Sequence, residues 1–436
     1  MNYNLKKYVK KKINDSIILV PIDDNVERNF IELNDTGANI FEKLENGYSI
    51  NDIINELKKI YIEETEIIKN DVEDFLLSLF NYGILSLEDH DIGRYDEFEY
   101  DITDVYSKMQ TYYFKNNIPF KFFLELTYNC NLRCPHCYIQ EDLTKENDFI
   151  DKNIVFKTIN QIEQLDGVEL IITGGEATLH PDLFEILEYA TSKNLLVTLL
   201  TNGLNLYDEE YFERLITLPL VDIRISLYGI SKIHNNFVHK TQAFERSFEV
   251  LKKLRKRKGL GTGVYVLTNF NIDCLDEVVK LAETNGVPIV ITPTIMATAK
   301  GDKKPLDYRL SYDQLKYFTG KYLKNLNGSI CTAGISRFRI TPMGDVNPCE
   351  MMRHVKIGNI HDNDLFEIME SKSRKEWITY FHKMNNEHEC NNCSKKKFCN
   401  YCPGLFHVEN GSFLTKSSFV CMFTNLKNEY VLSIGE

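Results

Sequence analysis

The feature that most constrains this chain is a group of three cysteines, Cys130, Cys134 and Cys137, with the spacing C-x3-C-x2-C. They follow a largely apolar run, 121–127, that is typical of a β-strand. Three thiolates are one fewer than the four that hold an ordinary iron–sulfur cluster, so one iron would remain open for another ligand. The alternative is a structural zinc knuckle with a distant fourth ligand. The spacing favours the cluster.

The composition is that of a globular protein, with 436 residues, 43% hydrophobic residues and a net charge of −12. This acidic balance argues against a general nucleic-acid-binding protein. No apolar run approaches the roughly 18 residues that span a bilayer, and the run behind the lysine-rich N-terminus is too short for a signal peptide. We therefore expect a cytoplasmic protein without nucleic-acid or membrane partners, in which clustered cysteines serve metal or redox chemistry.

Residues 1–95 are expected to form a small domain of three strands followed by three helices. The predicted strands are Tyr8–Ile13, Ile17–Pro21 and Phe30–Leu33, and the predicted helices are 36–46, 51–61 and 66–82. Such a domain suits either a winged helix for DNA or a module that binds a peptide at its sheet edge. Five lysines could attract an acidic peptide, although a solvated strand face is their more common role: Lys6, Lys7, Lys10, Lys11 and Lys12.

Residues 96–118 are polar and aromatic without clear periodicity, which indicates a linker. In 119–325, strand candidates alternate with amphipathic helical stretches, so the sequence predicts a parallel sheet curled into a partial barrel. The candidates are 121–127, 169–173, 196–201, 221–227, 263–269 and 288–293. In such a barrel the chemistry lies at the C-terminal ends of the strands, where Gly174-Gly175-Glu176, Asn202 and Ser226 would join the cysteine loop.

The cysteine loop, Gly174-Gly175-Glu176 after the second strand and six βα units together resemble the radical S-adenosylmethionine (SAM) superfamily over about 120–300. The resemblance implies a partial (β/α)6 TIM barrel in which Cys130, Cys134 and Cys137 hold a 4Fe–4S cluster. Its fourth iron would chelate the amino and carboxylate groups of SAM. The implied chemistry is reductive cleavage to methionine and a 5′-deoxyadenosyl radical, which abstracts a substrate hydrogen.

Six residues are expected to contact SAM: Tyr138, Gly174, Gly175, Glu176, Asn202 and Ser226. Glycines let the backbone approach a ligand closely, and a carboxylate can accept a charge-assisted hydrogen bond from the amino group. The alternative for Glu176 is a buried structural carboxylate. By the family's pattern Ser226 is a ribose contact and Tyr138 an adenine neighbour. His234 also falls near the expected rim, His136 is expected to pack locally, and no catalytic acid or base is assigned.

Residues 326–436 contain seven further cysteines, of which Cys390-x2-Cys393 and Cys399-x2-Cys402 alone would suggest a zinc ribbon. The full pattern instead resembles the SPASM domain, which follows radical SAM barrels and carries auxiliary iron–sulfur clusters. The two-residue spacing between Cys399 and Cys402 departs from the usual three. Carried over by position, two further 4Fe–4S clusters, three in all, would be held by Cys390, Cys393, Cys399 and Cys421, and by Cys331, Cys349 and Cys402.

Family members whose first auxiliary cluster is fully ligated have an extra cysteine shortly after the first, where this chain has Arg337. We therefore expect a second open iron, unless a non-cysteine group fills it. An open iron suits capture of a substrate thiolate, because soft thiolates favour iron–sulfur clusters. The eleventh cysteine, Cys274, is expected to be a small buried residue.

The N-terminal domain resembles the winged-helix-like PqqD leader-recognition element in the run 30–37 and in Asp71-Val72. Together the resemblances imply a maturase that binds the leader of a ribosomally made precursor peptide and receives electrons from a flavodoxin- or ferredoxin-type reductant. Thioether crosslinks at cysteine are the favoured product. Carbon–carbon crosslinking is the nearest alternative, and a non-catalytic iron–sulfur sensor or peptide-binding scaffold is a more remote one.

Overall fold

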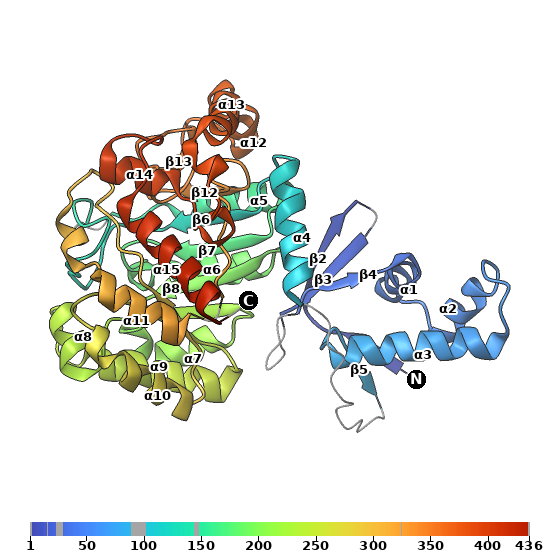
Figure 1. Ribbon diagram of the computed structural model, residues 1–436. Helices are drawn as coiled ribbons and strands as arrows, with labels where there is room; N and C mark the ends of the chain where they lie inside the picture. Colours follow the sequence, from blue (N-terminus) through green and yellow to red (C-terminus); the bar gives the residue numbers. More distant parts are fainter. Residues whose placement is uncertain are drawn as a thin grey trace.

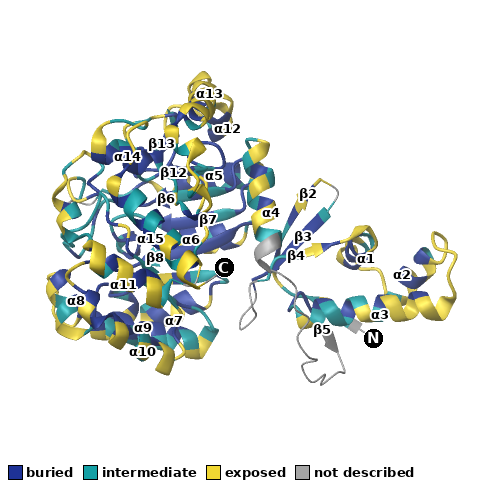
Figure 2. Cartoon of the chain, in the orientation of Figure 1, coloured by how far each residue is buried: buried dark blue, intermediate teal, exposed yellow. Residues whose placement is uncertain are grey.

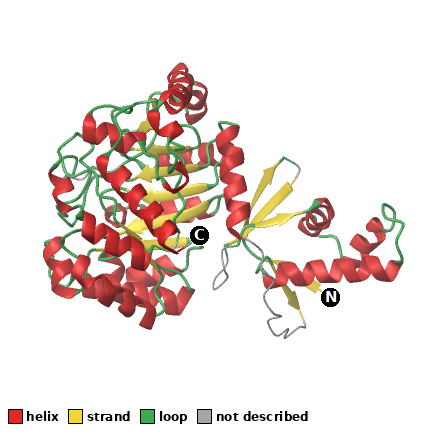
Figure 3. Ribbon diagram, viewed as in Figure 1, coloured by secondary structure: helices red, strands yellow, loops and turns green. Residues whose placement is uncertain are grey.

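The computed structural model describes residues 2–14, 16–22, 29–88, 102–143, 148–323 and 325–434. An N-terminal domain stands beside a larger body in which helices surround a nine-stranded sheet (Figures 1 and 3). Within these ranges no helix has the length and apolar character needed to cross a membrane.

The N-terminal domain contains the three strands and three helices that the sequence predicts. Strands β2 (Tyr8–Ile13), β3 (Ser16–Pro21) and β4 (Ile31–Leu33) form an antiparallel sheet in the order β2-β3-β4. Helices α1 (Asp35–Glu45), α2 (Ile50–Leu57) and α3 (Thr65–Asn81) follow, and β1 (Asn2–Leu5) pairs with β5 (Leu85–Glu88).

The sheet of the N-terminal domain is buried on both faces, which explains the continuous apolar run of β3. Ile17 and Leu19 pack with the helices α1–α3, whereas Ile18 and Val20 belong to a second apolar cluster. That second cluster also contains residues of the large body, including Val168. Because alternate side chains of a strand point to opposite faces, a strand covered on both sides has no polar alternation. The two parts of the molecule thus share a core.

The linker prediction for 96–118 is wrong for most of its length, because helix α4 (Ile102–Lys115) occupies it. Helix α4 lies between the N-terminal sheet and the large body (Figure 1). Its buried side chains include Met109 and Tyr113, four positions apart, and Tyr106 packs against Phe30 with ring centroids 5.0 Å apart. The buried positions do follow a helical repeat, but they are occupied by tyrosines and a methionine rather than by aliphatic residues. The repeat is therefore hard to recognise in the sequence. Residues 96–101 lie outside the described ranges.

The large body contains the expected partial barrel of six parallel strands in sequential order. The strands are β6 (Lys121–Glu125), β7 (Glu169–Thr173), β8 (Leu196–Thr201), β9 (Asp222–Leu227), β10 (Thr262–Val266) and β11 (Ile289–Thr292). The connecting helices include α5 (Lys152–Gln164), α6 (Leu183–Thr191), α7 (Glu209–Ile216), α8 (Ser231–Phe237), α9 (Ala243–Lys258) and α10 (Leu275–Thr284). Figure 2 shows buried strands beneath helices whose outer faces are exposed.

The C-terminal part adds strands to the same sheet, which the sequence did not predict. Strand β12 (Arg337–Ile340) pairs in parallel with β6, and β13 (Asp345–Asn347) and β14 (Gly358–Asn359) extend the sheet in antiparallel order. The helices of this part are α11 (Tyr312–Tyr322), α12 (Leu365–Glu370), α13 (Lys372–Glu387), α14 (Pro403–Asn410) and α15 (Ser418–Ile434). The first barrel strand is therefore an interior strand of the sheet.

Candidate functional site

At the C-terminal ends of β7 and β8, the carboxylate of Glu176 accepts hydrogen bonds from three residues, Thr178, Thr201 and Asn202. We call these four residues the Glu176 floor. Oε1 accepts hydrogen bonds from the Thr178 hydroxyl (2.6 Å), the Thr201 hydroxyl (2.6 Å) and the Thr178 amide (3.1 Å). Oε2 accepts one from the Asn202 amide (2.7 Å). Burial raises the pKa of Glu176 despite these donors. Glu176 is therefore a buried structural carboxylate, as the alternative for this residue expected. Its Oε2 still has a lone pair that could accept a hydrogen bond from a ligand.

Gly174 and Gly175 allow the loop after β7 to lie directly on the backbone that leads into the cysteine loop. A Cβ atom on Gly174 would lie 2.5 Å from the Thr127 carbonyl oxygen, and one on Gly175 would lie 2.4 Å from that of Asn129. The Gly175 amide donates to Thr127 O (2.8 Å), and the Glu176 amide donates to Asn129 O (2.8 Å). In this structure the glycines therefore serve close approach between two segments of the chain.

Asn202 connects the same floor to the cysteine loop itself. Its side-chain amide donates to Asn131 Oδ1 (2.7 Å), between Cys130 and Cys134. Its own Oδ1 accepts from the Leu204 amide (3.0 Å), which fixes the side chain. Four of the six residues expected to contact SAM, Gly174 to Glu176 and Asn202, thus position the cysteine loop from below.

The ten clustered cysteines fall into three groups, in each of which burial and the other members raise the pKa of one thiol. Cys134 interacts with Cys130 and Cys137, which form the radical group with it. Cys349 interacts with Cys331 and Cys402, the three-cysteine group. The four-cysteine group comprises Cys390, Cys421, Cys399 and Cys393. The groups have the same members as the ligand sets that the resemblance implies, which remain predictions. All eleven cysteines are free thiols.

The chemistry of these groups fits iron–sulfur clusters. Burial, together with neighbouring thiols, raises the pKa of Cys130 to about 11 and that of Cys331 to about 12. A bound cation reverses this preference, because coordination deprotonates a thiol. Among the described residues no three His, Cys, Asp or Glu side chains are arranged to hold a single metal ion. The individual ligand assignments stay predictions.

A cavity of about 650 Å³ connects the barrel rim with the three-cysteine group. Tyr138 and Ser226, the other two expected SAM contacts, line it on the barrel side, and Cys331, Cys349 and Cys402 line it on the C-terminal side. Residues of the barrel rim, Ser226 in β9 and Tyr138 after β6, therefore face the same cavity as cysteines more than a hundred positions later. The sequence predicted both sets but could not predict that they share a cavity.

Arg337 and Glu350 form an ion pair in this cavity, beside the three-cysteine group. The guanidinium of Arg337 also lies 4.5 Å from the ring centroid of Phe123, and its Nε has no hydrogen-bond partner among the described residues. Burial opposes the charge on Arg337, but Glu350 and the thiols of Cys349 and Cys331 outweigh it and raise the arginine's pKa. The cation thus lies directly beside the three-cysteine group.

A buried ion network fastens the C-terminal part to the base of the cysteine loop. Glu125 and Arg339 are 1% and 0% exposed, and Arg339 Nε donates to Glu125 Oε1 (2.7 Å). Arg353 Nη2 donates to the same oxygen (3.0 Å), while its Nη1 donates to Asp142 Oδ2 (3.0 Å). Burial opposes ionisation of Glu125, yet the two guanidinium groups hold its pKa below the usual value. Tyr138 lies beneath Arg353, 5.5 Å from its guanidinium carbon.

Of the two histidines noted in the sequence, His234 is buried, whereas His136 packs against aromatic rings and also lines the cavity. His234 is 1% exposed, and its Nδ1 accepts a hydrogen bond from the Tyr228 amide (3.1 Å). The ring of His136 packs against Tyr228 and Phe237, with centroids 4.9 and 5.2 Å away. Tyr228 itself lines the cavity and interacts with Cys134 and Ser226. Sequence reasoning missed it, although its position two residues after Ser226 places it on the same face.

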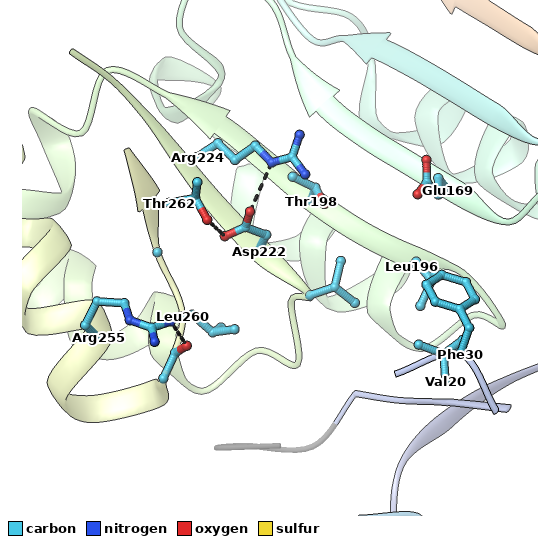
Figure 4. Close-up of a pocket in the computed structure, with 13 residues that line it drawn as sticks. Val20, Phe30, Glu169, Leu196, Thr198, Asp222, Arg224, Arg255, Leu260 and Thr262 are labelled. Atoms are coloured by element: carbon cyan, nitrogen blue, oxygen red, sulfur yellow. Dashed lines mark hydrogen bonds and ion pairs between the residues drawn. The ribbon is translucent and has the colours of Figure 1, made fainter. Parts of the chain in front are cut away.

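A second cavity, of about 520 Å³, lies at the opposite ends of the strands (Figure 4). Asp222, at the start of β9, accepts hydrogen bonds there from Arg224 Nε (3.0 Å) and from the Thr262 hydroxyl (3.2 Å). Val20 and Phe30 of the N-terminal domain close its other side. Its lining includes none of the clustered cysteines, so it is not part of the candidate site.

Three family models match separate parts of the chain. The radical SAM superfamily model matches 124–282, and the SPASM model, an iron–sulfur cluster-binding domain, matches 331–394. The model of coenzyme PQQ synthesis protein D (PqqD) matches 18–85.

Curated relatives are similar over different shares of the chain. Mycofactocin maturase MftC of Mycobacterium tuberculosis is 28% identical over 253 residues, which are 53% of this chain and 64% of that protein. AdoMet-dependent heme synthase of Methanosarcina barkeri is 26% identical over 342 residues, 69% of this chain and 95% of that protein. The subtilosin biosynthesis protein AlbA of Bacillus subtilis is 24% identical over 408 residues, 86% and 84% of the two chains.

Among solved structures, Streptococcus suis SuiB bound to its precursor peptide SuiA has a TM-score of 0.60 and 16% identity. The match covers 96% of this chain and all of that one, and at this identity it concerns the fold. The fold and the three matching models indicate the same three domains, and the shared cavity lies between two of them. The chain therefore contains a PqqD domain, a radical SAM domain with a partial barrel, and a SPASM domain, in that order.

Proposed function

We propose that this protein is a maturase that forms thioether crosslinks in a ribosomally made precursor peptide, joining a cysteine sulfur to a carbon atom. The observation that carries the proposal is the cavity of about 650 Å³ that Tyr138 and Ser226 share with the three-cysteine group. A peptide segment in this cavity would have a carbon near the radical group and a thiol near the second group. The names of the peptide maturases among the relatives support a peptide substrate.

The residues of the cavity have distinct roles in this proposal. With SAM bound, the cluster of the radical group would supply a 5′-deoxyadenosyl radical for hydrogen abstraction. Ser226 and Tyr138 orient the ligand at the rim, and the Glu176 floor holds the cysteine loop in place. The guanidinium of Arg337 favours an anionic thiolate over a neutral thiol beside Cys331 and Cys349. The open position of the three-cysteine group would then receive the substrate sulfur.

The N-terminal domain would bind the leader at the outer edge of β4. The opposite edge of its sheet, β2, is closed, because the Lys10 amide donates to Asn194 Oδ1 (2.8 Å) and Asn194 Nδ2 donates to Lys10 O (2.6 Å). Strand β4 is the remaining edge of the sheet order β2-β3-β4. An extended peptide can add to such an edge through backbone hydrogen bonds. A tethered core then reaches an effective concentration on the order of millimolar.

Mass spectrometry of a precursor peptide produced together with this protein tests the crosslink. Each thioether removes one hydrogen from the thiol and one from the carbon, so the peptide should lose two hydrogens per crosslink. The crosslinked cysteines should resist alkylation, and a precursor produced alone is the control. Cysteines that remain freely alkylatable in a peptide that has lost two hydrogens would exclude the thioether.

Hydrogen exchange tests the leader site separately. Leader peptide without its core should protect the amides of 31–33, while those of 8–13, on the closed edge, stay unchanged. Protection confined to other segments would contradict binding at β4. This measurement needs no crosslink, so it separates leader binding from chemistry.

Carbon–carbon crosslinking is the second candidate, favoured by the match to a coenzyme PQQ synthesis protein. Replacing every cysteine of the precursor by alanine distinguishes the two reactions. A two-hydrogen loss that persists in the cysteine-free peptide would establish the carbon–carbon alternative. If anaerobic reconstitution with dithionite gives no 5′-deoxyadenosine with any peptide, the protein is a non-catalytic iron–sulfur scaffold.

A further inference from the structure

The tetrapeptide 399–402 connects the two auxiliary cysteine groups. Cys399 belongs to the four-cysteine group, and Cys402 belongs to the three-cysteine group with Cys331 and Cys349. Only Asn400 and Tyr401 separate them. The short spacing that departs from the usual pattern therefore places two side chains at the passage from one group to the other.

Tyr401 has a buried hydroxyl with no hydrogen-bond partner among the described residues. Its ring is held edge-on against His388 and Phe406, with both pairs of ring centroids 5.5 Å apart. The phenol interacts electrostatically with Cys390 most strongly, then with Cys331, Cys399 and Cys402. Tyr401, Cys390, Cys399 and Cys402 also pack against the same apolar cluster, so the phenol lies beside cysteines of both groups.

The neighbouring residue fixes the same loop. Asn400 Oδ1 accepts a hydrogen bond from Lys427 Nζ (3.4 Å), and Lys427 is only 2% exposed. Asn400, Tyr401 and Lys427 all line the cavity of the candidate site. Leaving a buried hydroxyl without an acceptor is unfavourable, so a fixed loop that keeps one there implies a missing acceptor. The cysteines packed against the same apolar cluster, Cys390, Cys399 and Cys402, make sulfur atoms the candidate acceptors.

We infer that Tyr401 is a positioning residue whose hydroxyl donates a hydrogen bond to a sulfur of the cluster at the four-cysteine group, on the side that faces the three-cysteine group. Its ring packs against His388, whose Nδ1 accepts a hydrogen bond from the Cys390 amide (3.0 Å), and this contact assigns it to that cluster. The inference rests on the auxiliary clusters of the proposed function but not on the identity of the crosslink.

Such a hydrogen bond raises the reduction potential of the cluster that accepts it. Reduction adds negative charge to the cluster, and a donor to sulfur stabilises that charge. The four-cysteine cluster would therefore be easier to reduce than without Tyr401. An electron released next to the three-cysteine group would then pass more readily to the four-cysteine group.

Redox titration of the anaerobically reconstituted full-length protein, followed by electron paramagnetic resonance, tests this inference. Tyr401→Phe keeps the ring contacts and removes the donor, so one auxiliary potential should become more negative while the other two clusters are unchanged. Tyr380→Phe, an exposed tyrosine on α13, is the matched control and should shift nothing. Unchanged potentials in Tyr401→Phe at full iron and sulfide content would overturn the inference.

A second substitution covers the case in which Tyr401→Phe loses a cluster. Replacing Tyr401 by 3-fluorotyrosine keeps the residue and makes its hydroxyl a stronger donor, so the same potential should become less negative. No shift, or a shift in the opposite direction, would overturn the inference. Crosslinks formed with unshifted potentials would count against Tyr401 alone, whereas shifted potentials without crosslinks would count against the proposed function.

Discussion

At the scale of single residues, Gly175 determines how the cysteine loop is supported. Gly175→Ala would place a methyl group 2.4 Å from the Asn129 carbonyl oxygen, which belongs to backbone and cannot rotate away. We expect most iron of the radical group to be lost and 5′-deoxyadenosine formation to fall about 100-fold, as for a 1 Å misplacement.

Iron analysis and a SAM cleavage assay measure this effect, and Gly320→Ala is the control. Gly320 lies in α11, where an added Cβ would be 3.8 Å from the nearest atom, the ring of Tyr430. That variant should keep its iron and activity. Equal losses in both variants would show that the close approach at Gly175 is not the cause.

His234 gives a prediction about pH. Burial lowers the pKa of His234 to about 4, whereas an unfolded histidine titrates near 6.5. The unfolded state therefore binds the proton more readily, so this contribution to stability is present above pH 6.5 and is lost as pH falls through 4. In His234→Asn the amide oxygen can still accept from the Tyr228 amide, and the melting temperature should depend less on pH between 6.5 and 4. The same pH dependence in the unchanged protein and in His234→Asn would show that buried His234 is not its cause.

At the scale of elements, the pairing of β12 with β6 depends on the buried pair of Arg339 and Glu125. Arg339→Met would leave a buried carboxylate with one fewer cation, at a cost of about 3–5 kcal/mol. Arg257→Met is the control, because its partner Glu213 lies on an exposed helix face and surface pairs contribute little. Anaerobic urea denaturation should show a large loss of stability for the first variant only. Similar losses in both variants would show that the buried pair contributes no more to stability than the exposed pair.

Helices and strands could be predicted where a single hydrophobic pattern runs through the whole element. The strand predictions for 169–173 and 196–201 coincide with β7 and β8, because apolar runs between turns identify buried parallel strands. Strand β12 could not be predicted, since its sequence, Arg337–Ile340, alternates arginines whose partners lie on β6 and in the cavity. The residues of the floor could be named from motifs. Their contacts, and the roles of Arg337 and Tyr401, depend on distances that no local pattern encodes.

At the scale of the whole molecule, the N-terminal domain is docked through Lys11 as well as through apolar contacts. Lys11 is 2% exposed and donates to Gly167 O (2.7 Å) and Asp166 Oδ1 (3.2 Å) on the barrel. Lys11 is therefore unavailable to attract an acidic peptide, which was one of the two roles considered for the five N-terminal lysines. Burial lowers its pKa, which Asp166 partly offsets.

Lys11→Ala would leave the Gly167 carbonyl without this donor, at about 1–3 kcal/mol, and weaken the docking. Hydrogen exchange in 8–13 should become faster while exchange in α3 stays the same. Lys12→Ala, whose side chain is exposed, is the control and should leave both unchanged. Unaltered exchange of β2 in Lys11→Ala would show that the apolar cluster alone docks the domain.

The place of β12 beside β6 has a consequence for synthesis on the ribosome. Arg339 and Glu125 are 214 positions apart, so at 5–20 residues per second roughly 10–40 s pass between their appearances. During that interval β6 has one open edge, and Glu125 lacks its buried partner. The strand that leads into the cysteine loop is thus the earliest of the sheet to be made and among the last to be enclosed. Until then, the loop at its end is accessible from that side to whatever delivers iron and sulfide.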